Sequence, residues 1–369
     1  MKRLFAKIKT NKYGLYMAAV FGLLGLAVIL TTLAATPSAT VYLEAENTTT
    51  SSNAVVVNDS QASLGKAIRF DNVPPTAKSR FPGDPNPKVN KKAYWGSSIG
   101  GNGDPVPRHE QPTGTSLSIR RTFFQWSNVT NLTSSLYNTV KDDHANNRLP
   151  FISFKTPGWK AMGDGTYNKE IDAMLRQLDS YGKPVWLVAH HEPEGGGTFG
   201  NSPDDPGGPA EWRRMQIKIR QRINAVGTKN IAFMPVVMTY TWNPASNRTP
   251  NDWWVDGIWD AYCVDHYRHS IEGNMIDKAW LDFVSWIESR GLPYCLGEWG
   301  NRGTDAQAAQ EVRDYWEWGF NNKKDFIGYA YFDSGLNSPS GSWELTGEQL
   351  KTFQDILKND TRVQRINDL

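Results

Sequence analysis

Short runs of apolar residues recur along the chain from residue 92 onward, and stretches with helical periodicity separate most of them. The runs are rich in β-branched and aromatic residues and are bounded by turn-forming residues, as buried parallel strands are. Strands are predicted at residues 93–99, 117–126, 149–155, 185–190, 231–238, 258–267, 294–298 and 326–332. Helices are predicted at residues 131–145, 169–181, 209–226, 275–290, 305–320 and 347–357, several with apolar positions on one face only.

This alternation predicts a (β/α)8 TIM barrel over residues 92–360. A doubly wound sheet is the competing α/β architecture, and it needs a glycine-rich phosphate turn that opens a helix after the first strand. Glycines follow the first strand here, but no helical pattern begins on them. The barrel is therefore the better interpretation.

Residues 1–40 have the pattern of a signal peptide or signal anchor. Five basic residues precede an apolar run at residues 15–33, and small residues follow it. The run approaches the roughly 20 residues that span a bilayer, so cleavage and retention are both open. The basic residues orient such a segment with the remainder of the chain outside the cytoplasm. A secreted or cell-surface protein is expected, with membrane contact only through this segment.

Residues 41–91 predict a short β-rich extension and a linker. Two expected strands, at residues 41–47 and 62–70, resemble the opening of a β-sandwich carbohydrate-binding module. A complete sandwich needs about 100 residues, so only a fragment is present. Acidic positions leave open a structural calcium at Glu44 or Glu46, although an ordinary exposed acidic strand is the better explanation. Residues 71–91, rich in proline, asparagine and lysine, are expected to be a linker.

Composition narrows the class of partner. The 369 residues carry a net charge of +2 and no long basic tract beyond the first dozen residues, which argues against nucleic-acid binding. The chain also holds 15 Trp, 14 Tyr and 15 Phe, more flat apolar surface than a core needs. Such faces stack on sugar rings, although most aromatic residues in any protein serve packing.

Two predicted strands each end in a carboxylate. The fourth runs into His190, His191 and Glu192, and the seventh ends at Glu298. In αβ barrels the carboxyl ends of the strands surround the catalytic cavity. Two carboxylates that meet at this edge suit acid/base and nucleophilic work on a glycosidic bond.

The order of these motifs resembles the clan A glycoside hydrolases, and glycoside hydrolase family 26 most closely. The resemblance runs from about residue 94 to residue 357 and rests on Tyr94-Trp95-Gly96, Trp126, His191-Glu192, Trp242-Asn243-Pro244, Asp265-His266-Tyr267, Glu298 and Tyr331-Phe332-Asp333. It implies a retaining endo-glycoside hydrolase of the β-mannan or β-glucan type, active as a monomer without cofactor or catalytic metal. The loop after Glu192 lacks the aromatic residue typical of the family, which leaves the particular polysaccharide open.

The resemblance also implies roles for individual residues. Glu192 would be the acid/base and Glu298 the nucleophile, with Tyr267 holding Glu298 in its charged form. Other expected substrate-binding residues are His191, Trp126, Trp242, Asn243, Asp265, Trp299 and Phe332. Trp95, Trp126, Trp242, Trp299 and Phe332 lie near predicted strand ends, where their faces would floor the cleft.

Two other classes of function stay open. A metal-dependent polysaccharide deacetylase or amidohydrolase would use the group His190, His191, Glu192, Asp265, His266 and His269, although alternate residues of a strand face opposite ways. A carbohydrate-binding barrel without catalysis would lack one of the two carboxylates.

Two further expectations concern single residues. Glu194 is expected on a mobile loop with at most a substrate contact. Cys263 and Cys295, on neighbouring strands, are expected as two buried thiols because a bond between adjacent parallel strands is rarely well shaped.

Overall fold

The computed structural model describes residues 54–58, 66–70, 80–195, 207–268, 275–302, 305–321, 324–335 and 342–369. The chain forms two compact units, residues 1–76 and 77–369. In the first, β1 (Ala54–Asn58) pairs with β2 (Lys66–Phe70) as an antiparallel ladder, and β2 confirms part of the strand predicted at residues 62–70. The predicted segment 1–40, the strand 41–47 and the calcium position at Glu44 or Glu46 lie outside the described residues. Within the described part of the chain, no helix has the length and apolarity needed to cross a bilayer.

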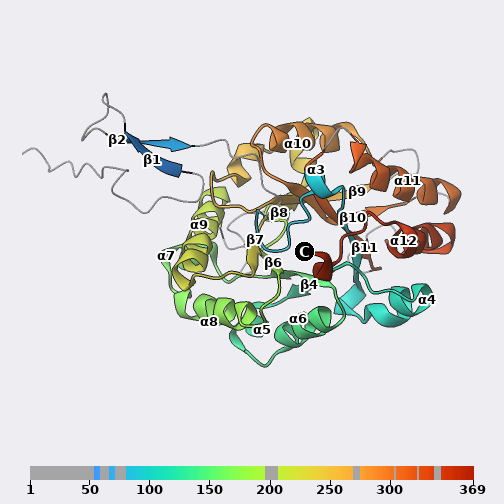
Figure 1. Ribbon diagram of the computed structural model, residues 1–369, viewed down its shortest axis with the longest axis horizontal. Coiled ribbons are helices and arrows are strands. Elements are labelled where there is room, and N and C mark those ends of the chain that lie inside the picture. The colour runs from blue at the N-terminus through green and yellow to red at the C-terminus, as the bar shows by residue number, and fades with distance from the viewer. Residues whose placement is uncertain are drawn as a thin grey trace, which may run out of the picture. The chain divides into compact units, whose positions relative to one another are not determined.

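The second unit is a parallel sheet of 9 strands curled into a barrel and surrounded by helices (Figure 1). The strands are β3 (Tyr94–Ile99), β4 (Ile119–Phe124), β5 (Leu149–Phe154), β6 (Val185–Ala189), β7 (Ile231–Phe233), β8 (Val236–Met238), β9 (Tyr262–Arg268), β10 (Tyr294–Asn301) and β11 (Phe326–Asp333). The hydrogen-bonded order is β7-β6-β5-β4-β3-β11-β10-β9-β8. This arrangement fits a (β/α)8 barrel.

The additional strand arises because the predicted fifth strand is divided at Pro235. β7 pairs with β6 and β8 pairs with β9, so the two halves join the ends of the sheet. Proline has no backbone N–H for a ladder hydrogen bond. Its carbonyl still accepts a bond of 3.1 Å from the backbone N–H of Cys263. Strand structure is therefore present within residues 231–238 as predicted, but as two short strands and not as one.

Helices cover the outside of the barrel (Figure 1). Those that match predicted segments are α6 (Ser135–Ala145), α8 (Asn168–Asp179), α9 (Pro209–Val226), α10 (Lys278–Glu288), α11 (Asp305–Trp318) and α12 (Gly347–Asn359). Shorter helices absent from the prediction are α3 (Pro87–Asn90), α4 (Gln111–Thr113), α5 (Trp126–Thr130) and α7 (Trp159–Asp164). α9 begins with Pro209 at its first position and ends before Gly227 at φ 73°, the usual proline start and glycine stop.

The amino-end mouth of the barrel is closed by both ends of this unit. Phe81 and Ile366 are buried in the cluster that fills the barrel interior. Arg80 binds Asp325 with its Nη1 at 2.7 Å from the carboxylate, and Trp186 donates its Nε1–H to the carbonyl of Pro82 at 3.2 Å. The linker predicted at residues 71–91 is thus wrong from residue 80 onward, because apolar and charge contacts fold this segment onto the barrel.

Cys263 and Cys295 form a disulfide, so the expectation of two free thiols was wrong. The register of β9 and β10 places the two residues directly opposite each other, with their Cα atoms 4.5 Å apart. This separation lies within the range that disulfides span. The bond lies inside the barrel, among the apolar residues of the interior cluster.

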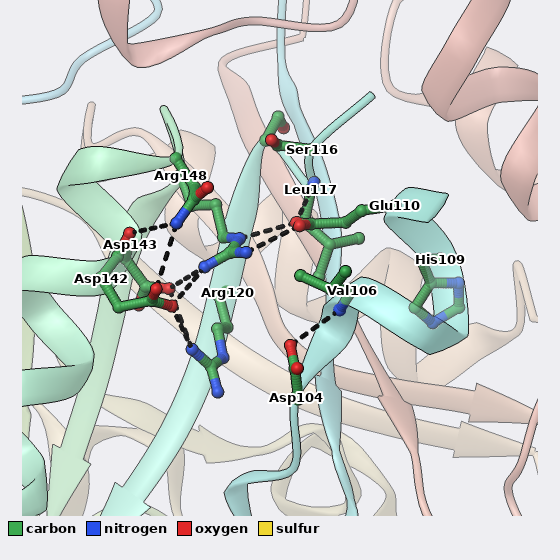
Figure 2. A network of polar contacts seen from close by, with 12 residues as sticks. Asp104, Val106, His109, Glu110, Ser116, Leu117, Arg120, Asp142, Asp143 and Arg148 are labelled. Atoms are coloured by element: carbon green, nitrogen blue, oxygen red, sulfur yellow. Dashed lines mark hydrogen bonds and ion pairs between the residues drawn. The ribbon is translucent and has the colours of Figure 1, made fainter. Parts of the chain in front are cut away.

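A buried charge network fixes the connection between β3 and β4 (Figure 2). Glu110 binds the guanidinium of Arg148 through both carboxylate oxygens at 2.6 Å and also accepts the backbone N–H of Leu117. Arg120 reaches Asp143 at 3.2 Å and the carbonyl of Gly103 at 2.9 Å. The connection is therefore anchored to the outside of β4 and to α6. Its first residues, 100–102, lie at the carboxyl ends of the strands.

Candidate active site

A pocket of about 560 Å³ opens at the carboxyl ends of the strands. It is lined by Ile99, Gly100, Gly101, Asn102, Phe123, Phe124, Gln125, Lys155, His191, Glu192, Met238, Asp265, Tyr267, Glu298, Phe332, Ser334 and Trp343. Both predicted catalytic carboxylates therefore lie on one pocket. The structure brings His191, Asp265, Tyr267 and Phe332 to the same pocket, as predicted for substrate-binding residues.

Glu298 is presented by a local irregularity in β10. The register with β9 shifts between Leu296 and Glu298, so that Glu298 pairs with Asp265. The residue at the shift is Gly297, where a Cβ atom would lie 2.6 Å from Cγ2 of Val236. Only glycine allows β8 to approach β10 this closely, and the shift turns Glu298 toward the pocket.

Two donors hold the Glu298 carboxylate. Tyr267 donates its hydroxyl to Oε2 at 3.2 Å, as the family resemblance implied. Arg121, which the sequence did not single out, donates from Nη2 to Oε1 at 3.3 Å. Its guanidinium is fully buried, lies 4.6 Å from the ring centroids of Phe123 and Phe151, and also binds Ser153 Oγ at 3.0 Å. The ionised form of Glu298 thus has a fixed cation on one oxygen and a hydroxyl on the other.

Glu192 follows β6 on a turn with unusual backbone angles. His190 and Glu192 have φ values of 56° and 49°, a left-handed conformation that costs about 1–2 kcal/mol for a residue other than glycine or asparagine. The backbone N–H of Glu192 donates to the carbonyl of Val236 at 2.8 Å, which fastens the turn to β8. The side chains of Glu192 and Asp265 both line the pocket. Strain of this kind clusters at functional sites.

Three carboxyl groups line the pocket, and two of them, Asp265 and Glu298, are each only 4% exposed. Burial, reinforced by the negative charge of Glu192, raises the pKa of Glu298 to about 8, and the hydrogen bonds from Arg121 and Tyr267 oppose this rise only in part. Burial and the Glu192 charge also raise the pKa of Asp265 well above its usual range. Tyr267 alone was expected to keep Glu298 charged, and that expectation was too simple, because burial outweighs the hydrogen bonds. Glu298 and Asp265 therefore hold a proton to higher pH than ordinary carboxyl groups do.

His191 faces the pocket as a neutral ring. Burial, reinforced by the Arg121 charge, holds its pKa well below the usual range. Its Nδ1 is buried and has no hydrogen-bond partner among the described residues. A neutral imidazole with one free nitrogen is suited to hydrogen bonding with a sugar hydroxyl.

Loop residues complete the rim. Asn102 bonds both the N–H and the C=O of Phe123 through its side-chain amide, at 2.9 and 2.6 Å, and so continues the ladder where β3 and β4 diverge. Trp343 is 4% exposed, lies 4.9 Å from the ring of Tyr267 and lines the pocket. Trp343 was not among the predicted site residues, because it lies outside the predicted strands.

Most of the aromatic residues that were predicted to floor the cleft lie in the hydrophobic core instead. Trp95 and Trp299 are 0% exposed and Trp242 is 8% exposed, and all three pack in the cluster between the barrel and its helices. Trp299 is adjacent to Glu298, and successive strand residues point to opposite faces. Trp126 opens α5 and packs on Phe154 and Tyr167 outside the pocket lining. Asn243 uses its side chain to accept the backbone N–H of Ala245 and does not line the pocket either. The predicted stacking role of the four tryptophans and the predicted substrate contact of Asn243 were therefore wrong.

The histidines of this group that the structure describes do not assemble into a metal site. His190 bonds Thr156 Oγ1 at 2.9 Å and packs on Trp159, whereas His266 points outward to Thr239 and the carbonyl of Met275. His269 lies outside the described residues. Among the residues that the structure describes, no group of three or more His, Cys, Asp or Glu side chains is arranged to hold a metal ion.

The Pro-Glu-Gly context of Glu194 predicted a mobile loop, and this prediction was wrong. The side chain is 0% exposed, and Oε1 accepts hydrogen bonds from the backbone N–H of Met238 and the hydroxyl of Thr241. Burial raises its pKa to about 8. The hydrogen bonds from Met238, at the end of β8, and from Thr241 hold the side chain in the interior.

The fold matches solved catalytic domains of glycoside hydrolase family 26. The catalytic domain of the endo-β-1,4-mannanase of Bacillus sp. JAMB-750 aligns with a TM-score of 0.54 and 12% identity over 77% of this chain and 90% of that one. The β-mannanase of Bacteroides ovatus aligns with a TM-score of 0.52 and 12% identity, covering 77% and 93%. The family 26 domain of an endo-β-mannanase/endo-β-glucanase from Prevotella bryantii gives a TM-score of 0.51 and 14% identity, covering 78% and 99%.

Comparison of the sequence with protein-family models and with curated proteins finds no match. At these identities the structural likeness establishes a family 26-like barrel and leaves the activity to be argued from the site.

Proposed function

We propose that the protein is a retaining endo-glycoside hydrolase that cleaves a β-linked polysaccharide of the mannan or glucan type. The observation that carries the proposal is Glu298, held by Arg121 and Tyr267, on the same pocket as Glu192. A carboxylate fixed by two donors is a poised nucleophile, and a second carboxyl beside it is a poised acid. The structural neighbours include a mannanase and a mannanase/glucanase domain, which supports this substrate class.

In the first step Glu298 attacks the anomeric carbon while Glu192 gives its proton to the leaving oxygen. Glu298 must be ionised for this step, and the hydrogen bonds from Arg121 and Tyr267 favour its ionised form. In the second step Glu192 takes a proton from water, which opens the glycosyl-enzyme. His191, Phe332 and Trp343 line the pocket where the sugar ring would bind.

Chemical rescue tests the assignment of the two roles. Glu298→Ala should be inactive on a panel of mannan, mixed-linkage glucan, β-1,3-glucan and xylan. Azide should restore cleavage of an activated aryl glycoside by attacking from the vacated face. Glu192→Ala should keep the first step on substrates with good leaving groups, because these need no proton. If azide rescues neither variant and the panel shows no cleavage by the wild type, the proposal fails.

We also propose that the catalytic unit acts outside the cytoplasm as a monomer. The charge and apolar pattern of residues 1–40 supports export, and so does the Cys263–Cys295 disulfide, because disulfides persist mainly in oxidising compartments. N-terminal sequencing of the mature protein should begin near Ala35 or Thr40 if the segment is cleaved. A retained segment would instead leave the protein in membranes after carbonate extraction.

A further inference from the structure

Glu194 joins the turn that carries Glu192 to the last residue of β8 and to the turn that follows it. Its Oε1 accepts the backbone N–H of Met238 at 3.0 Å and the hydroxyl of Thr241 at 2.9 Å. Its Oε2 is buried and has no hydrogen-bond partner among the described residues. The side chain is thus committed to two donors on one neighbouring segment and does not reach the pocket lining.

The same turn is fastened by its backbone. Gly195 donates its N–H to the carbonyl of Glu192 at 3.0 Å, and Arg248 donates from Nη2 to the carbonyl of Glu194 at 2.8 Å. These bonds close the turn around Glu192, whose φ of 49° is otherwise unfavourable. A strained residue keeps its conformation only when the surroundings over-determine it. Of the side chains in this turn, Glu194 is the one that ties the strained residue to a second barrel strand.

We propose that Glu194 is a positioning residue that fixes the direction of the Glu192 side chain by locking residues 192–195 to Met238 and Thr241. This inference rests on the proposed role of Glu192 as the acid. The buried carboxyl acts through its acceptor oxygen, and its raised pKa fits a group that remains largely protonated at neutral pH. An amide has the same acceptor oxygen, so glutamine should substitute for Glu194 whereas alanine should not.

Kinetics on two leaving groups distinguishes positioning from general support of the fold. The assay compares kcat/KM on the polysaccharide that the wild type cleaves with kcat/KM on a 2,4-dinitrophenyl glycoside of the same sugar. Glu194→Ala should lower the first about 100-fold, as expected for a misplaced catalytic group. The second should change less than about threefold, because that leaving group needs no proton.

Two companion variants sharpen the result. Glu194→Gln should return both values to within about threefold of wild type, because it restores the acceptor oxygen. Thr241→Val removes one of the two donors at nearly constant shape and should give a smaller loss in the same direction. If Glu194→Ala does not fold, Thr241→Val tests the same contact in its place.

Glu110→Gln is the matched control. Glu110 is likewise a buried glutamate that accepts a backbone N–H, but it lies in the network outside β4, where its main partner is Arg148 (Figure 2). This variant should lower the Tm and affect both substrates alike. The inference is overturned if Glu194→Ala lowers both values equally, or if it lowers neither.

Hydrogen–deuterium exchange provides a readout that needs no activity. Amide exchange over residues 189–195 should accelerate in Glu194→Ala and stay at the wild-type rate in Glu194→Gln. Unchanged exchange in the alanine variant overturns the inference. Azide rescue of Glu298→Ala reports separately on the proposed function, so a failure of the positioning role and a failure of the hydrolase assignment give different results.

Discussion

Replacing Arg121 by methionine tests what stabilises the ionised form of Glu298, the proposed nucleophile. Methionine fills much of the space between Phe123 and Phe151 but removes the guanidinium that lies 3.3 Å from Glu298. A hydrogen bond to a charged group contributes about 1.5–3 kcal/mol. At about 1.4 kcal/mol per factor of ten, this predicts a loss of about 10- to 150-fold in kcat/KM at pH 6.

The pH profile shows whether the loss has this cause. Arg121 lowers the pKa of Glu298, so its removal must raise that pKa and move the acidic limb of kcat/KM to higher pH. The assay is kcat/KM against pH on an activated aryl glycoside, with Tm recorded to show that the variant is folded. Arg121→Lys, which keeps a positive charge, should lie between wild type and Arg121→Met.

Arg120→Met is the matched control. Arg120 is the adjacent residue of β4 but binds Asp143 and the carbonyl of Gly103 on the opposite face (Figure 2). Its removal should lower the Tm and leave the acidic limb in place. The reasoning is refuted if Arg121→Met keeps the wild-type limb, or if both variants move it equally.

Three further predictions follow from the site and the core. In Glu192→Gln the loss of a neighbouring negative charge should lower the pKa of Glu298 below its value of about 8, and the acidic limb for an activated glycoside should move to lower pH accordingly; a limb that moves upward would contradict the coupling. Trp343→Ala should raise KM because Trp343 lines the pocket, whereas Trp299→Ala should leave KM unchanged and destabilise the protein by about 3–5 kcal/mol in urea unfolding, because Trp299 is fully buried outside the pocket lining; an equal rise of KM in the two variants would contradict the corrected assignment. Alkylation of the unfolded, unreduced protein should leave Cys263 and Cys295 unmodified by intact mass, and reduction should add two labels; labels without reduction would exclude the disulfide.

The sequence predicted the barrel well because strand and helix periodicities are local signals. α9 has the predicted bounds, since Pro209 and Gly227 mark its ends. Glu192 and Glu298 were found because each follows a short apolar strand and the carboxyl ends of such strands share one edge.

What the sequence did not predict depends on register and on contacts between distant segments. The role of Arg121 could not be predicted without knowing which residues of its strand face the barrel interior. For Trp299 a signal was present, because side chains alternate along a strand and Trp299 must therefore face away from the side of Glu298. The Cys263–Cys295 bond follows from the register of β9 and β10, which places the two residues opposite each other and which no local pattern reveals. Pro235 was a visible signal for the break between β7 and β8 that the strand prediction did not use.

The stereochemistry of the wild-type reaction tests the central claim most directly. Proton NMR in the first minutes of polysaccharide cleavage resolves the anomeric signal of the new reducing end before mutarotation. Double displacement through Glu298 predicts a β-anomer first, with configuration retained. An α-anomer as the first product would contradict the account, because it would require a water molecule between two carboxylates that lie further apart.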